Sequence, residues 1–198
     1  MLFENTALDL NLDRATITYY PKFLNTTDSK ALFEALLQHT SWREVKITVF
    51  GKTYLQPRLT ALQAENSNPY SYSNLTMHPV PFCSDVLQIK KKLESFTGLT
   101  FTTCLLNLYR DGKDSNGWHA DDEKELGSSP IIASVSLGAT RTFKLRRKKE
   151  TKTAKKIDLT SGSLLLMQGK TQTYWQHQIP KTAKPVEPRI NLTFRTVL

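Results

Sequence analysis

Hydrophobic residues recur at helical spacing in two stretches of the first half of the chain. Asp28 and Ser29 open a run whose apolar positions continue to Leu36, and Ser84 opens a second run that Gly98 is placed to end. The apolar face of the second run comprises Val86, Ile89, Leu93 and Phe96. We therefore predict two helices that cover one face of a sheet.

Short runs of β-branched and aromatic residues predict strands elsewhere. One such run, Ala15–Tyr20, precedes the first helix, and from Thr100 onward similar runs alternate with Gly, Pro, Asp and Ser. The later candidate strands are Thr100–Tyr109, Ile131–Leu137, Thr142–Arg147, Ile157–Leu159, Ser163–Met167, Thr173–Trp175 and Asn191–Val197. About seven short strands indicate a sandwich or jelly roll, so we expect a mostly β fold with flanking helices.

The segment from Gln56 to Phe82 is polar and rich in turn residues, with four prolines. A long irregular segment inside a compact domain is usually functional, so we interpret it as a lid or binding loop. At 198 residues, the chain is expected to fold as a single domain, residues 1–198.

The sequence carries no sign of export or of a membrane anchor. Residues 1–14 contain three acidic residues and no long apolar run, unlike a signal or transit peptide. No stretch approaches the roughly 20 apolar residues that span a bilayer. We expect an intracellular monomer, cytoplasmic or, in a eukaryote, nuclear, and not secreted. Cys83 and Cys104 are too few for a disulfide framework or a zinc cluster, so free thiols are expected.

Positive charge is concentrated in one segment of a chain whose formal net charge is +9. Between Arg141 and Lys156, nine basic residues lie against one acidic residue, Glu150. The basic residues are Arg141, Lys144, Arg146, Arg147, Lys148, Lys149, Lys152, Lys155 and Lys156. The run is either a solvated hairpin or a patch that binds nucleic acid, because clustered cations that neutralise phosphates release condensed counterions.

Three residues could hold a metal ion. His119 and Asp121 are two apart, which on an extended segment places imidazole and carboxylate on the same side, and His177 lies further along the chain. Two histidines and one carboxylate are the ligand set of non-haem Fe(II) oxygenases, which leaves coordination positions open. The alternative is an ordinary solvent-exposed pair, which is common for His-x-Asp alone.

Four polar residues alternate with apolar ones near the C-terminus. Arg189, Asn191, Thr193 and Arg195 would share one face of a strand and line either a cavity or solvent. Two arginines on that face suit a dicarboxylate, because a guanidinium pairs with a carboxylate in bidentate geometry. Asn107 and Tyr109 could add neutral donors from a facing strand. The alternative is an exposed strand whose arginines meet acidic residues elsewhere.

Six motifs follow one another in a specific order. They are Asn107-Leu108-Tyr109, His119-Ala120-Asp121-Asp122-Glu123, Ser134-Val135-Ser136-Leu137-Gly138-Ala139, Gly162-Ser163-Leu164-Leu165-Leu166-Met167, His177 and Arg189-Ile190-Asn191-Leu192-Thr193-Phe194-Arg195. Together they resemble the AlkB family of Fe(II)/2-oxoglutarate-dependent dioxygenases, strongly over residues 100–198. The resemblance extends weakly to Pro57-Arg58 and Tyr70-Ser71-Tyr72-Ser73, and it is greatest for the branch that acts on DNA bases.

The resemblance implies a fold and a set of roles. The fold is a double-stranded β-helix, or jelly roll, over about residues 100–198, with N-terminal helices packed on the sheet and a nucleotide-recognition lid in about residues 1–99. The implied Fe(II) ligands are His119, Asp121 and His177. The implied 2-oxoglutarate residues are Asn107, Tyr109, Arg189, Asn191, Thr193 and Arg195. The implied substrate contacts are Pro57, Arg58, Tyr70, Tyr72, Asp122 and Glu123.

The implied reaction is repair of 1-methyladenine and 3-methylcytosine in DNA or RNA. Fe(II), 2-oxoglutarate and O₂ together hydroxylate the N-methyl group, and the product releases formaldehyde from a base that is flipped out of its stack. Two other functions stay open at this point. One is a 2-oxoglutarate-dependent hydroxylase of a protein or small molecule, which would not need the basic run. The other is a nucleic-acid-binding module without turnover.

Overall fold

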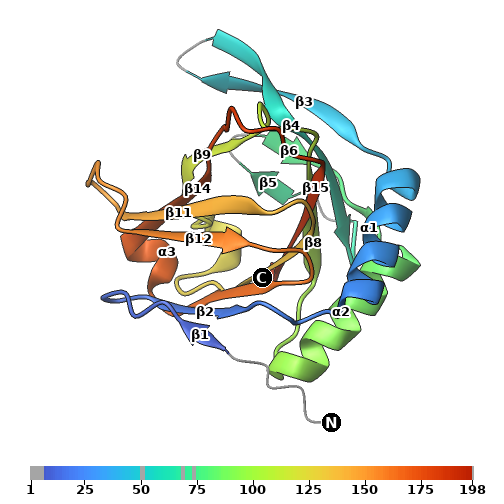
Figure 1. The fold of residues 1–198 in the computed structure, drawn as a ribbon, viewed down its shortest axis with the longest axis horizontal. Helices are drawn as coiled ribbons and strands as arrows, with labels where there is room; N and C mark the ends of the chain where they lie inside the picture. Colours follow the sequence, from blue (N-terminus) through green and yellow to red (C-terminus); the bar gives the residue numbers. More distant parts are fainter. Residues whose placement is uncertain (1–6, 50–51, 68–69, 73–74, 198) are drawn as a thin grey trace.

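The computed structural model describes residues 7–49, 52–67, 70–72 and 75–197 of the chain, and its core is a pair of antiparallel sheets (Figure 1). The major sheet contains, in spatial order, β1 (Leu8–Asp9), β2 (Thr16–Tyr20), β13 (Leu164–Gln168), β10 (Ile132–Gly138), β15 (Arg189–Arg195), β8 (Thr103–Tyr109), β4 (Lys52–Ala64) and β3 (Arg43–Val49), with β7 (Val80–Pro81) parallel to β4. The minor sheet contains β12 (Lys155–Leu159), β11 (Arg141–Arg147), β14 (Trp175–Ile179) and β9 (Asn116–His119). A separate two-stranded sheet joins β5 (Tyr70–Tyr72) to β6 (Leu75–Met77).

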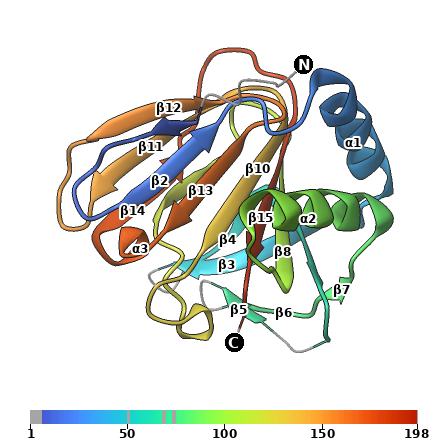
Figure 2. The ribbon, with the colours of Figure 1, turned by 90° about the horizontal axis from the view of Figure 1, so that it is seen from below.

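Two hydrophobic cores lie on the two faces of the major sheet. One fills the space between the sheets and includes Leu105, Ile132 and Leu145. The other lies under two helices, α1 (Thr26–His39) and α2 (Ser84–Thr97), which Figure 2 shows on the side of the major sheet away from the minor sheet. This arrangement confirms the predicted jelly roll with flanking helices. No helix among the described residues is both long and apolar enough to cross a membrane.

Both predicted helices are present, but α1 begins two residues before the predicted opening at Asp28, and the N-cap of α2 is Cys83, which forms no side-chain cap hydrogen bond. The Asn25 side chain caps α1 by accepting a hydrogen bond from the backbone N–H of Asp28 at 2.8 Å. Gly98 ends α2 in the left-handed conformation, with φ of +69°. Phe96, however, is 42% exposed and lies edge-on to Tyr20, so its predicted place on the buried face is wrong.

One loop prediction and one strand prediction are also corrected. Much of the predicted loop from Gln56 to Phe82 belongs to the 13-residue strand β4 and to β5, β6 and β7. Residues 171–174 form the short helix α3 (Thr171–Tyr174), where a strand at Thr173–Trp175 was predicted, and β14 begins only at Trp175. A 3-10 turn, η1 (Lys124–Leu126), follows the predicted acidic motif.

Cys104 and one arginine of the basic run are buried, and Cys83 is half-buried against the helix core. Cys83 and Cys104 are free, as predicted, and burial raises the pKa of the Cys104 thiol. Arg141 is buried and donates hydrogen bonds to the backbone carbonyls of Asp111, Asp114 and Pro180 at 2.8–3.0 Å. The predicted surface run therefore begins at Lys144, and Arg141 instead joins β11 to two loops.

The helix core should tolerate truncation poorly. Leu93 of α2 is fully buried, and replacing it with alanine removes packed atoms and leaves a cavity. We expect a loss of about 2–5 kcal/mol in the free energy of unfolding, measured by urea denaturation. Leu87→Ala on the same helix is the matched control, because Leu87 is 36% exposed and should lose far less. Equal losses would contradict the packing of α2 on the major sheet.

Candidate active site

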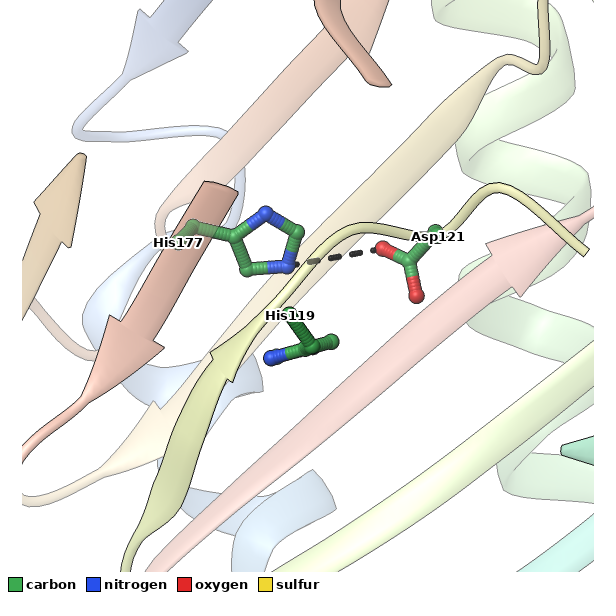
Figure 3. A group of neighbouring side chains, drawn as sticks. All are labelled: His119, Asp121 and His177. Atoms are coloured by element: carbon green, nitrogen blue, oxygen red, sulfur yellow. Dashed lines mark ion pairs between the residues drawn. The ribbon is translucent and has the colours of Figure 1, made fainter. Parts of the chain in front are cut away.

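The three predicted metal ligands meet between the sheets (Figure 3). His119 ends β9 and His177 lies on β14, and the two are direct partners in the register of the minor sheet. Asp121 follows β9 after one intervening residue. Their candidate ligand atoms all lie within 4.8 Å of one another. The His-x-Asp spacing and the cross-strand pair therefore place three donors around one point.

The charge states of these residues fit a divalent metal. Burial lowers the pKa of His177 to about 3, with a further contribution from nearby His119, and desolvation lowers the pKa of His119. Both imidazoles are then neutral at pH 7 and keep a lone pair for a metal. Burial alone would raise the pKa of Asp121, but Arg195 and the two histidines lower it, so this carboxylate is charged. The donor set fits iron.

Neighbouring groups hold the ligands in place. His119 Nδ1 lies 2.8 Å from the Gly117 carbonyl, which leaves Nε2 as the candidate ligand atom. Asp121 Oδ1 accepts a hydrogen bond from Arg195 Nη2, and Oδ2 lies 3.5 Å from His177 Nε2. The Asp121 backbone N–H donates to Gln172 Oε1 at 3.0 Å. Gln172 belongs to α3, and no motif in the sequence indicated this supporting role.

The predicted 2-oxoglutarate residues line the same cavity as the metal ligands. Strands β15 and β8 are neighbours, and their register pairs Arg189 with Tyr109 and Asn191 with Asn107. All six candidates are buried, so the alternative of an exposed C-terminal strand is wrong. The six that line the cavity are Asn107, Tyr109, Arg189, Asn191, Thr193 and Arg195. The cavity is therefore polar on its β8–β15 side.

Arg189 is suited to an anionic ligand. Its Nη2 donates to Ser136 Oγ at 2.9 Å, whereas its Nε and Nη1 are buried without a hydrogen-bond partner among the described residues. Burial lowers its pKa to about 10, which still leaves the guanidinium charged at neutral pH. A buried charge with unused donors is costly unless a partner is bound. A carboxylate of 2-oxoglutarate would supply that partner.

Serines of β10 complete this wall, and sequence reasoning gave them no role. Ser134 Oγ accepts a hydrogen bond from Asn191 Nδ2 at 2.7 Å, and Ser136 Oγ accepts the bond from Arg189. Both serines were visible only as members of a motif. The available signal was that Ser134 and Ser136 alternate with apolar residues on an otherwise hydrophobic strand. A buried hydroxyl needs a hydrogen-bond partner, so this alternation indicates a polar neighbour on that face of the strand.

The predicted substrate residues are in different settings. Arg58 is buried on β4 and donates from Nε to Asn107 Oδ1 at 2.7 Å, while the carbonyl of the adjacent Pro57 accepts from the Ser115 N–H. Asp122 is exposed and forms an ion pair with Lys148 at 2.7 Å. Glu123 Oε2 is buried without a hydrogen-bond partner in the described part of the chain, and burial raises its pKa to about 7. Arg58 and Glu123 thus lie close to the ligand cluster.

Tyr70 and Tyr72 lie on β5, beside β6. Their side chains, and Ser73, lie outside the described residues, so their role as a lid stays a prediction.

The fold and the site together define a class of protein. A set of two histidines and one carboxylate leaves positions open on the metal, and it is typical of non-haem Fe(II) oxygenases. Here the set lies inside a jelly roll, beside a buried arginine, Arg189, two of whose nitrogens have no hydrogen-bond partner among the residues that the structure describes.

Comparisons with known proteins agree with this class. Residues 16–195 match the family model of the 2OG-Fe(II) oxygenase superfamily. Alpha-ketoglutarate-dependent dioxygenase alkB homolog 3 of Homo sapiens is 45% identical over 190 residues, covering 91% of this chain and 66% of that protein. DNA oxidative demethylase ALKBH2 of Mus musculus is 35% identical over 189 residues, covering 90% of this chain and 79% of that protein. A solved structure of OsALKBH1 shares the fold, with a TM-score of 0.64 and 19% identity over 96% of this chain and 99% of that one.

The chain therefore belongs to the 2OG-Fe(II) oxygenase superfamily and, within it, to the AlkB family. It spans just under two thirds of the length of alkB homolog 3, at 66%.

Proposed function

We propose that this chain is an oxidative demethylase that repairs alkylated bases in DNA, with RNA as a second substrate. Its preferred lesions are 1-methyladenine and 3-methylcytosine, and it requires Fe(II), 2-oxoglutarate and O₂. The observation that carries the proposal is the placement of His119, Asp121 and His177 in one cavity with Arg189, whose Nε and Nη1 lack partners among the described residues. The name "DNA oxidative demethylase" of a 35% identical relative supports the substrate class.

In this mechanism the protein holds and orients the reactants. His119, Asp121 and His177 hold the iron, which with O₂ supplies the oxidising chemistry when bound. Arg189 binds one carboxylate of 2-oxoglutarate, and the polar wall of β8 and β15 orients the rest of it. When bound, 2-oxoglutarate would supply two electrons for the reduction of O₂ and be consumed as succinate and CO₂, with one oxygen atom of O₂ in succinate and the other available for the N-methyl carbon. The N-methyl carbon gains a hydroxyl group, and the resulting hemiaminal splits into formaldehyde and the unmodified base.

The acidic residues beside the iron ligands select the lesion. A base methylated at these Watson–Crick positions is cationic, whereas normal bases are neutral, and a low-dielectric pocket strengthens attraction between opposite charges. Glu123 has a buried oxygen without a hydrogen-bond partner in the described residues, so it is placed to accept a hydrogen bond from the flipped base. Arg58 donates a hydrogen bond to Asn107, which lines the cavity of the iron ligands. Tyr70 and Tyr72 cover the base as part of the lid.

The partner is nucleic acid, and the enzyme acts as an intracellular monomer. The basic run from Lys144 to Lys156 supplies cations for the phosphates near the flipped base. The Lys148–Asp122 ion pair ties this run to the segment that carries Asp121, so the charge lies beside the site.

The first test is the mass of an oligonucleotide that carries one 1-methyladenine, measured after incubation with protein, Fe(II), 2-oxoglutarate and air. We expect the loss of one methylene's mass in the complete mixture and none when iron is omitted. Methylated single-stranded DNA, duplex DNA and RNA are compared. The alternative hydroxylase would be established by two results together. None of the methylated nucleic acids loses mass, and 2-oxoglutarate is converted to succinate when a protein or a metabolite is supplied as the substrate.

A further inference from the structure

The outer face of the minor sheet carries a set of side chains that lie outside the metal and co-substrate cavity, among them two lysines of the basic run. Strand alternation turns Phe143 and Leu145 of β11 into the core, and it turns their neighbours outward. The outward residues on β9, β11, β12 and β14 include Trp118, Lys144, Arg146, Lys156, Gln176 and Gln178, which we call the stacking platform, and Thr142 and Asp158 lie beside it on the same face. Figure 1 shows β11 and β12 on the side of the molecule away from α1 and α2.

An arginine and a tryptophan stack at the centre of this platform. The Arg146 guanidinium carbon lies 4.3 Å from the centroid of the Trp118 ring. Arg146 Nε and Nη2 both donate to Gln176 Oε1, at 3.3 and 3.2 Å, which fixes the guanidinium in place. Aromatic rings and guanidinium planes are the groups on which unpaired bases stack. The platform therefore offers a preformed stacking position.

The charges around this stack favour a polyanion. Lys144 lies directly opposite Lys156 in the register of β11 and β12, and like charges in that position repel each other. Asp158, two residues beyond Lys156, accepts a hydrogen bond from Thr142 Oγ1 at 2.7 Å. Phosphates placed between the two lysines would relieve their repulsion.

The platform is connected to the active site through β9. Trp118 directly precedes His119, and the two side chains lie on opposite faces of that strand. β9 is the last strand of its sheet in the described part of the chain, so a flexible polymer can pass around its free edge. A single strand can follow that path, whereas a duplex is stiff and keeps its bases stacked inside.

We propose that the stacking platform binds single-stranded nucleic acid that flanks the target base. One base stacks on the Trp118–Arg146 pair, and the adjacent phosphates lie against Lys144 and Lys156. This inference rests on the proposed function for the identity of the target base, but the binding itself can be measured without turnover.

Binding is tested by fluorescence anisotropy with an unmethylated single strand of about 15 nucleotides and with its duplex. Lys144→Gln/Lys156→Gln should flatten the slope of log affinity against log salt by about 1.4, since each phosphate contact on a single strand contributes about 0.7. Trp118→Ala should weaken single-strand binding about tenfold, and Trp118→Phe should restore most of it. Lys30→Gln/Lys91→Gln on α1 and α2 removes the same charge far from the platform and should change neither value.

Turnover on 1-methyldeoxyadenosine monophosphate separates this role from a structural one. The mononucleotide has no flanking base to stack on the platform, so the Trp118→Ala protein should demethylate it normally and lose activity only on the longer strand. An equal loss on both substrates would show that Trp118 merely supports His119 and would overturn the proposal. Two binding results would also overturn the proposal. One is an unchanged salt slope in the double lysine variant, and the other is an equal loss of affinity for the single strand and the duplex in the Trp118→Ala protein. If the wild type demethylates nothing, the proposed function fails, while the binding results still decide the platform.

Discussion

Replacing Asp121 with alanine is expected to abolish demethylation while leaving nucleic-acid affinity nearly unchanged. This carboxylate is buried, charged and within 4.8 Å of both imidazole ligand atoms, so its loss removes one of three iron donors. Mutating a mere supporting residue typically costs 10–100-fold in metal affinity, so losing a ligand should cost at least about 100-fold. Iron content after dialysis, turnover and binding of a labelled oligonucleotide are measured on the same preparation.

The control for this variant is Asp85→Asn in the first turn of α2, which removes a carboxylate outside the site. It should keep wild-type iron content and turnover. Normal demethylation by the Asp121→Ala protein would refute the iron assignment. Loss of oligonucleotide binding together with iron would instead indicate that the fold had been damaged, which near-ultraviolet circular dichroism can detect.

Replacing Arg189 with lysine should chiefly raise the KM for 2-oxoglutarate. Lysine keeps the charge but lacks the planar fork that binds a carboxylate in bidentate geometry. Losing one of the two charge-assisted hydrogen bonds of the fork costs about 1.5–3 kcal/mol, which corresponds to at least about tenfold in apparent affinity. Succinate formation is measured as a function of 2-oxoglutarate concentration, at saturating methylated oligonucleotide.

Arg43→Lys makes the matched change at an exposed arginine of β3 and should leave this KM unaltered. A KM within about twofold of the wild-type value in the Arg189 variant would remove Arg189 from the co-substrate site. An unchanged KM for the oligonucleotide in the same variant would show that the defect is confined to 2-oxoglutarate.

The residues of the site were predictable because their polar side chains recur at every second position, which is the spacing that places side chains on one face of a strand. His119 and Asp121 are two apart, and Arg189 to Arg195 alternate with apolar residues that are buried on the helix side of the sheet. The alternation indicated that the polar face was special, although it did not decide between cavity and solvent. Only the minor sheet, which packs over that face of the major sheet, excludes solvent from it.

The parts that were missed are those in which tertiary contacts outweigh local pattern. The inward face of β4 carries Gln56, Arg58 and Thr60, which are buried polar residues of the kind that normally marks a loop. Thr171 belongs to α3 because its hydroxyl bonds the carbonyl of Gln168 and accepts from the backbone of Thr16, 155 residues away. No local window contains that contact.

The position of β15 has a consequence for how the protein folds. β15 is the last of the described elements in chain order, yet it lies between β10 and β8 in the middle of the major sheet. On a ribosome, the earlier strands must therefore wait with unsatisfied edges until this segment emerges, and such long-range pairing is slow. Because Arg189 and Arg195 arrive with the same strand, the molecule gains its proposed co-substrate site only in the step that closes its fold.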